Sequence, residues 1–174
     1  MNEKSNSRIL QATLRDCKRM AELGREIVLE SFGDNYSEQD LADHIASNYT
    51  VGRYRDQLER PQTCLLYAEE SGVLKGYALG YPCSLPIDTE GKRAYELRRL
   101  YVRQNAKGSG IALQLLHEFV NWTKNAGYER LYVGIWEGNH RDRAYKRYGF
   151  KLVGKHSFQV GNQIDTDLIL MKEL

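Results

Sequence analysis

The stretch ELRRLYVRQNAKGSGIALQLL, residues 96–116, joins a strand, a glycine-containing loop and a helix. Its loop, residues 107–110, reads Lys-Gly-Ser-Gly and lies directly at the start of the helix, where oriented N–H groups and the helix dipole favour an anion. Glycine allows a ligand to approach the backbone closely. The stretch therefore predicts a phosphate-binding loop, although an isolated GxG is interpreted equally well as an ordinary strand-to-helix turn.

Two familiar phosphate-binding motifs are excluded for this loop. The chain has no GxxxxGK[ST] sequence, and the glycine spacing is not GxGxxG. In a dinucleotide-binding unit the glycine-rich loop follows the first strand. Here the strand before the loop comes in the middle of the chain, after a predicted hairpin. The loop must serve another phosphate-bearing ligand if it serves one at all.

Outward from this stretch, hydrophobic periodicity and turn residues predict one α/β domain over residues 1–174, with residues 1–7 as a flexible tail. We expect helices to begin at Asp16, Ser37 and Thr50, where a capping side chain precedes an apolar pattern. The remaining helices are expected at 109–126 and 139–148, and strands at 9–14, 63–69, 73–81, 93–102, 130–136, 150–158 and 166–172.

Composition narrows the class of protein. The chain is 41% hydrophobic and 28% charged with a net charge of +2, which is typical of a globular domain and too balanced for a nucleic-acid-binding protein. No apolar run approaches membrane-spanning length, and the polar start MNEKSNSR has no export signal. Three separated cysteines fit neither a disulfide scaffold nor a metal site. We expect a cytoplasmic protein with no nucleic acid, membrane or metal partner.

A second stretch, WEGNHRDRAYKRYGFKLVG, residues 136–154, places an asparagine after a strand and a tyrosine inside the next helix. Together, residues 96–116 and 136–154 resemble the GCN5-related N-acetyltransferase (GNAT) superfamily, and the resemblance extends over roughly residues 63–174. It implies the three-layer GNAT fold, in which helices flank a twisted, mixed and mostly antiparallel sheet of about seven strands. It also implies transfer of an acetyl group from acetyl-CoA by direct attack of a primary amine.

The resemblance assigns the cofactor site. In this family a [QR]xxGx[GA] loop holds the pyrophosphate of acetyl-CoA; Gly108 and Gly110 match it, whereas Asn105 stands where the family has glutamine or arginine. A bulge in the preceding strand frees backbone groups for the pantetheine arm and for the thioester oxygen. The implied cofactor-binding residues are Leu100, Tyr101, Val102, Lys107, Gly108, Ser109, Gly110, Ile111, Ala112, Asn139 and Tyr145.

The resemblance also implies two catalytic residues. Tyr145 matches the tyrosine that protonates the leaving thiolate, although with 12 tyrosines in the chain a packing role is the simpler alternative. Glu96 resembles the catalytic glutamate of histone-acetylating relatives, and a base is needed because an alkyl amine is mostly protonated at pH 7. On a regular strand Glu96 would share a face with Leu100 and Val102, a parity that a bulge would change. A salt bridge to Arg98 or Arg99 explains Glu96 equally well.

Charge patterning suggests the acceptor. Residues 16–43 carry eight acidic and three basic side chains, whereas residues 92–107 carry six basic and one acidic. We expect the acidic helices to attract a small cationic amine and the basic segment to attract the CoA phosphates, although a solvated helix face is the usual interpretation of such a run. The candidate substrate-binding residues are Glu30, Phe32, Asp34, Tyr36 and Tyr49.

The end of the chain, HSFQVGNQIDTDLILMKEL, residues 156–174, resembles the PaiA-like acetyltransferases, which act on spermidine and spermine. The resemblance makes a polyamine the leading acceptor and a homodimer plausible. Two alternatives stay open: the same enzyme acting on a protein N-terminus or lysine, and a non-catalytic acyl-CoA-binding sensor on the same scaffold.

Overall fold

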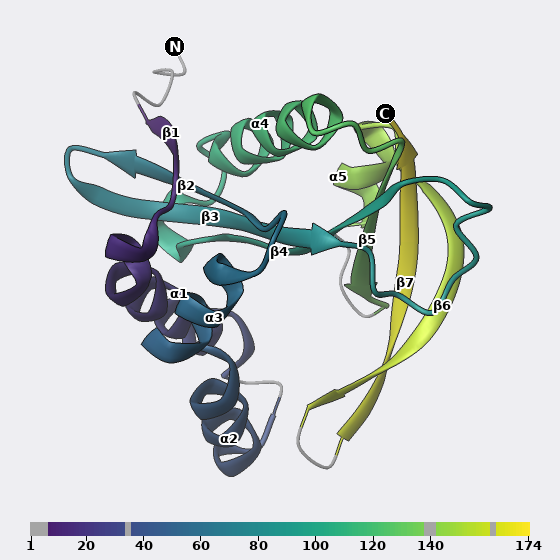
Figure 1. Ribbon diagram of the computed structural model, residues 1–174. Coiled ribbons are helices and arrows are strands. Elements are labelled where there is room, and N and C mark those ends of the chain that lie inside the picture. The colour runs from purple at the N-terminus through teal and green to yellow at the C-terminus, as the bar shows by residue number, and fades with distance from the viewer. Residues whose placement is uncertain (1–6, 34–35, 138–141, 161–162) are drawn as a thin grey trace.

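A mixed sheet runs through the computed structural model, which describes residues 7–33, 36–137, 142–160 and 163–174. Seven strands formed by these residues follow the order β1-β2-β3-β4-β5-β7-β6 (Figure 1). Neighbouring strands are antiparallel except β4 and β5, which are parallel. The strands are β1 (Arg8–Gln11), β2 (Cys64–Glu70), β3 (Val73–Pro82), β4 (Ala94–Val102), β5 (Arg130–Trp136), β6 (Lys151–Val160) and β7 (Gln163–Glu173). The predicted fold class is confirmed.

Helices cover both faces of the sheet. The helices α1 (Cys17–Phe32), α2 (Glu38–Asn48) and α3 (Val51–Glu59) lie on one face, and α4 (Ile111–Asn125) lies on the other (Figure 1). The short α5 (Asp142–Arg147) contributes Tyr145 to the hydrophobic core beneath α4. A separate core lies beneath α1 and α3, so strands β2 to β4 are buried on both sides.

The helix α4 forms where the sequence predicts it. Ile111, Leu115 and Phe119 recur on one face and are buried against the sheet. The helix begins at Ile111, two residues later than expected, because Gly110 precedes it in the left-handed conformation with φ 87°. Gly127, with φ 80°, follows its end as predicted. These two glycines set the ends of the helix that the cofactor loop leads into.

The predicted N-caps differ in their chemistry. The Ser37 hydroxyl accepts from Asp40 N at 3.1 Å, and the Thr50 hydroxyl accepts from Arg53 N at 3.1 Å. Asp16 precedes α1, but its carboxylate turns back and accepts from the backbone N and hydroxyl of Thr13, at 2.8 and 2.9 Å. This contact closes a 3₁₀ turn over Leu14–Asp16, which explains why β1 ends at Gln11.

The last hairpin is longer than its apolar pattern indicates. Strands β6 and β7 stay paired as far as Val160 and Gln163, beyond the predicted segments 150–158 and 166–172. The far ends of both strands extend toward the side of α2 (Figure 1). Backbone pairing holds these additional residues, and hydrophobic periodicity does not report it.

Candidate active site

A β-bulge in β4 sets the geometry of the site. Leu79 of β3 pairs with Arg99 and the next residue, Gly80, pairs with Leu97, so Arg98 is an additional residue in β4. The bulge changes which side chains share a face. Leu100 packs against the core beneath α4, whereas Glu96 forms its ion pair with Arg98 on the opposite face. Glu96 therefore does not share a face with Leu100 and Val102, which is the change of parity that a bulge was expected to cause.

Beyond the bulge, β4 separates from β5. Pairing with β3 continues to Val102, but pairing with β5 ends at Leu97 and Val133. The backbone of β4 after Leu97 therefore has one side that β5 does not pair with. This separation lies between two cavities, one on each side of the strand end.

The larger cavity is a groove of about 1140 Å³ between the end of β4, the loop before α4, and α5. Its walls include most of the predicted cofactor residues, namely Leu100, Val102, Lys107, Gly108, Gly110, Ile111, Ala112 and Tyr145. Its remaining lining includes residues that the sequence did not indicate, among them Ser7, Gln114, His117, Arg147 and Tyr148. Ser7, assigned to a flexible tail, donates a hydrogen bond to Gln114 at 2.8 Å.

The glycine loop is open toward this groove. Gly108 and Gly110 have φ values of 82° and 87°, and a Cβ added to either would meet no protein atom within 4 Å. The loop thus combines a left-handed backbone with free space next to the start of a 15-residue helix. Ser109 is turned inward, where its hydroxyl donates to Ala106 O at 2.7 Å. The space before the loop suits a phosphate group.

Among the described cofactor candidates, Tyr101 also lies outside the lining of the groove. Tyr101 follows Leu100 on the strand and therefore points to the opposite face, where it lines the smaller cavity. Asn139 lies outside the described residues. The side chain of Tyr101 therefore lines the smaller cavity and not the groove.

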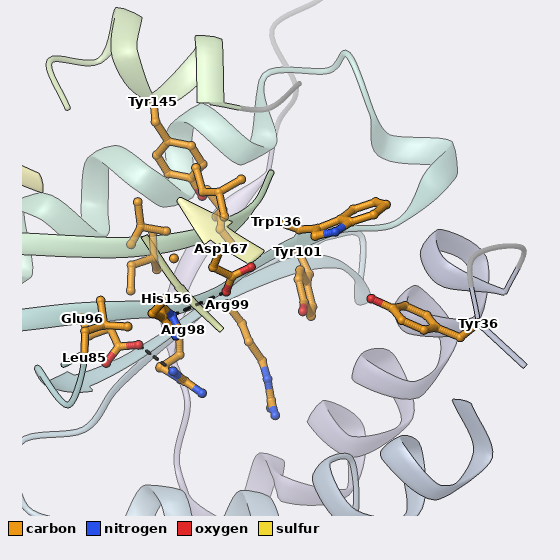
Figure 2. A pocket seen from close by; sticks show the side chains of 15 residues that line it. Tyr36, Leu85, Glu96, Arg98, Arg99, Tyr101, Trp136, Tyr145, His156 and Asp167 are labelled. Atoms are coloured by element: carbon orange, nitrogen blue, oxygen red, sulfur yellow. Dashed lines mark hydrogen bonds and ion pairs between the residues drawn. The ribbon is translucent and has the colours of Figure 1, made fainter. Parts of the chain in front are cut away.

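The smaller cavity, of about 140 Å³, lies on the other side of the strand end. Its polar lining comes from several elements and includes Tyr36, Glu96, Arg98, Arg99, Tyr101, Tyr145, His156 and Asp167 (Figure 2). Leu100 and Tyr145 line both this cavity and the groove. The two cavities therefore meet at these residues, next to the separation of β4 from β5.

Glu96 is buried at the edge of the smaller cavity and already has hydrogen-bond donors. Its side chain is 2% exposed, and its carboxylate is 2.7 Å from Arg98 Nη1. The backbone N and hydroxyl of Ser84 also donate to it, both at 3.1 Å. The salt-bridge interpretation of Glu96 is thus correct in its geometry, while the residue also lines the cavity.

A second acid–base pair, missed in the sequence, faces the same cavity. His156 Nε2 of β6 lies 3.8 Å from Asp167 Oδ2 of β7 (Figure 2). Burial raises the pKa of Asp167; the charges of His156 and Arg98 oppose this shift, and Asp165 adds to it. The alternation of Asp165 and Asp167 in the last strand was the only sequence signal for this pair.

Of the predicted substrate residues, some line the smaller cavity and others do not. Tyr36 lines the cavity and donates to Asp165 Oδ2 at 2.9 Å, and burial together with that carboxylate raises its pKa. Tyr49 is buried beneath the Arg99 guanidinium, 4.3 Å from it, and is not among the described residues that line the cavity. The side chain of Phe32 and the whole of Asp34 lie outside what the structure describes.

The acidic helix and the basic segment contact one another. Glu30 accepts from Gln104 N at 3.0 Å, and Glu26 forms an ion pair with Arg103. These charges were expected to attract two different ligands, but folding brings α1 beside the segment that follows β4. Part of the acidic excess of residues 16–43 is therefore used within the fold.

Two further features concern the described part of the chain. No helix in it is long and apolar enough to cross a membrane. No group of three or more His, Cys, Asp or Glu side chains within it is arranged to hold a metal ion.

Comparisons with known proteins agree with this geometry. The model of the acetyltransferase (GNAT) family matches residues 25–150. An N-acetyltransferase of Mycobacterium bovis is 27% identical over 137 residues, covering 78% of this chain and 83% of its own.

Two solved structures are similar over nearly the whole chain. The PaiA N-acetyltransferase of Thermoplasma acidophilum in complex with coenzyme A has a TM-score of 0.76 at 20% identity, with 97% of this chain and 99% of that one covered. The ribosomal-protein-alanine N-acetyltransferase of Brucella melitensis has a TM-score of 0.66 at 25% identity, with 96% and 99% covered.

Proposed function

The chain belongs to the acetyltransferase (GNAT) family, and we propose that the acceptor of its acetyl group is the primary amine of a small cationic molecule, with a polyamine as the leading candidate. The enzyme is an acetyl-CoA-dependent N-acetyltransferase. The observation that carries the proposal is the meeting of the two cavities at Leu100 and Tyr145. Acetyl-CoA in the groove and an amine in the smaller cavity would bring the thioester and the nucleophile together there.

The groove supports a long, phosphate-bearing cosubstrate. We assign the pyrophosphate to the loop at Gly108 and Gly110, where a side chain would occupy the free space and the amides precede α4. The pantetheine arm would extend along the unpaired side of β4 toward Leu100. A backbone N–H on that side is the donor we propose for the thioester oxygen, whose negative charge grows in the transition state.

Tyr145 is the proposed general acid. It is buried, it lines both cavities, and Figure 2 shows it reaching from α5 into the site. When the carbon–sulfur bond breaks, a phenol at this junction can protonate the thiolate. Packing against Phe150, with the ring centroids 5.4 Å apart, fixes the ring orientation.

The smaller cavity favours a slender amine. Drug-sized ligands occupy cavities of about 300–1,000 Å³, whereas this one has about 140 Å³. It thus suits the end of an alkyl chain better than a ring system. Asp167 in its wall and Asp165 beside Tyr36 supply negative charge along β7, and the PaiA enzyme is a structural neighbour. Both support a polyamine end, although Arg98 and Arg99 also line the cavity.

A protein or peptide N-terminus is the second candidate. It is also a slender primary amine, and the Brucella neighbour is a ribosomal-protein-alanine N-acetyltransferase.

The test is release of CoA thiol by purified protein with acetyl-CoA against spermidine, 1,4-diaminobutane, butylamine, amino acids and an alanine-initiated tripeptide. We expect the diamine and polyamine to give the highest kcat/KM, with a KM that rises with ionic strength because salt screens attraction to the carboxylates. The highest kcat/KM for the tripeptide, or an acceptor KM insensitive to salt, would overturn the polyamine proposal. Thiol release that no amine stimulates would overturn the small-amine proposal.

A further inference from the structure

His156 and Asp167 meet across the last hairpin with an open space in front of them. They are register partners on β6 and β7. On β5, Gly134 lines the same cavity, and a Cβ placed there would lie 3.2 Å from Asp167 Oδ2 and 3.6 Å from His156 Nε2. Any other residue at this position would fill the space that the pair faces. The glycine thus keeps a small polar recess open to the acceptor cavity.

The hydrogen bonding of His156 indicates where its ring proton lies. Nδ1 is 2.8 Å from Ser157 O, and a carbonyl can only accept, so Nδ1 carries the proton. In the neutral ring Nε2 then has a lone pair, and it faces a carboxylate oxygen at 3.8 Å, too far for a direct hydrogen bond. Two acceptors therefore face one recess, an arrangement that an ammonium group with several N–H donors satisfies.

Glu96 is less suited to take a proton from the acceptor. Its Oε1 accepts from Arg98, and its Oε2 accepts twice from Ser84. These three donors occupy much of the capacity of the carboxylate and tie it to the β4 bulge. Glu96 is therefore better placed to hold the bulge and Arg98 than to abstract a proton.

The charged and titratable groups around His156 come from every neighbouring element. Asp165 and Asp167 lie on β7, and Glu96, Arg98 and Arg99 lie on β4. Tyr36 and Tyr101 are near the mouth of the cavity, Tyr145 enters from α5, and Gly134 of β5 adds no charge. Two carboxylates on β7 thus favour a cation beside His156, while Arg98 opposes it.

We propose that this recess binds the ammonium group of the acceptor, with His156 Nε2 as the general base and Asp167 as the carboxylate that holds the cation. The inference rests on the proposed function, because it requires a primary amine in the smaller cavity. One ammonium proton passes to Nε2 and then to solvent, and the neutral nitrogen attacks the thioester carbon. As the C–N bond forms and the C–S bond breaks, Tyr145 protonates the thiolate. The second nitrogen proton restores the phenol.

Two acceptor substrates distinguish a general-base role of His156 from a merely structural one. Butylamine must lose a proton before it attacks, whereas its isostere O-propylhydroxylamine is already neutral at pH 7. His156→Gln should lower kcat/KM for butylamine by about 10²–10⁴-fold, the usual contribution of a general base, and leave the alkoxyamine within about threefold. Lys155→Gln is the matched control. Lys155 is the preceding residue on β6, and its ammonium pairs with Glu137 rather than lining the cavity.

The outcomes test the role of His156 separately from the proposed small-amine acceptor. Equal losses for both amines in His156→Gln, or a loss for butylamine in Glu96→Gln but not in His156→Gln, would overturn the assignment of the base and leave amine acetylation intact. Failure of the wild-type enzyme to acetylate either amine would overturn the small-amine proposal and the inference with it. Acetyl-CoA affinity, measured by calorimetry, should be unchanged in His156→Gln because His156 lies outside the groove.

Discussion

The phenol of Tyr145 is the proposed general acid of the reaction. Tyr145→Phe keeps the ring that packs against Phe150 and removes only the hydroxyl. We expect kcat to fall by about ten- to ten-thousandfold with little change in the KM for acetyl-CoA, because the proton is needed in the transition state. Steady-state kinetics with chemistry shown to be rate-limiting provides the measurement. An unaltered kcat would reduce Tyr145 to a packing residue.

We expect the buried Asp167 carboxylate to lower the free energy of unfolding. Burial raises its pKa, so ionisation is less favourable in the folded protein than in the unfolded chain. This penalty is absent below the unfolded pKa, near 3.9, grows as the pH rises from there to the folded pKa, and is constant above it. Asp167→Asn should therefore gain stability relative to wild type as the pH rises from about 4 to 8. Urea unfolding across this range measures the difference; a gap that shrinks with pH would contradict the assignment.

The sequence predicts the site residues that lie within one short motif. It misses those that come together only when distant segments fold. Gly108, Gly110 and Tyr145 lie in short stretches whose spacing is itself the signal. Glu96 was found because it resembles the catalytic glutamate of histone-acetylating relatives, but its partner Ser84 lies in a loop 12 residues earlier. His156 and Asp167 meet only because β6 and β7 pair in one particular register.

The contact between β3 and β4 is the element-scale feature that holds the bulge. A Cβ at Gly80 would collide with Glu96 O, and it would lie 2.5 Å from the ring of Phe119. Gly80→Ala should therefore cost about 1–3 kcal/mol of stability and reduce acetyl transfer, because β4 must shift. Gly52→Ala is the control, since its nearest neighbour would be 4.0 Å away. Urea unfolding of both variants tests this. Equal stabilities would contradict the inference that the close contact at Gly80 holds the bulge.

The loop before α4 provides a second element-scale prediction. Gly108→Val meets no protein atom within 4 Å, but it forces a β-branched residue to φ 82° and fills the proposed phosphate space. We expect acetyl-CoA binding, measured by calorimetry, to be lost while the fold persists by circular dichroism. Unchanged affinity would show that the phosphates lie elsewhere in the groove.

The order of strands and helices follows from sequence patterns, because apolar periodicity and turn residues are local. The bulge in β4 was expected from the family resemblance alone, and its position was not. The register against β3 places the additional residue at Arg98, so Glu96 does not lie on the side of Leu100. The length of the β6–β7 hairpin was also missed, since its outer residues are held by backbone pairing, which side-chain patterns do not report.

For the molecule as a whole, the resemblance of two stretches to one family was sufficient to predict the layered fold and the acetyl-CoA chemistry. Charge could not be placed from sequence alone, because the acidic α1 and the basic segment after β4 were expected to act on different ligands. The fold instead joins them through Glu26 and Arg103. In the proposed function, β7 supplies the negative charge for the acceptor, since Asp167 lines the smaller cavity. A homodimer stays a prediction.

The central claim is that acetyl transfer occurs directly between two ligands whose cavities meet at Leu100 and Tyr145. The most direct measurement is a single turnover with enzyme in excess over acetyl-CoA labelled in its acetyl group, in the presence of 1,4-diaminobutane. The account predicts that the label passes in one step to the monoacetylated diamine, with equimolar CoA thiol and no labelled protein at any time. Label that accumulates on the protein, or that is recovered only as acetate, would contradict it.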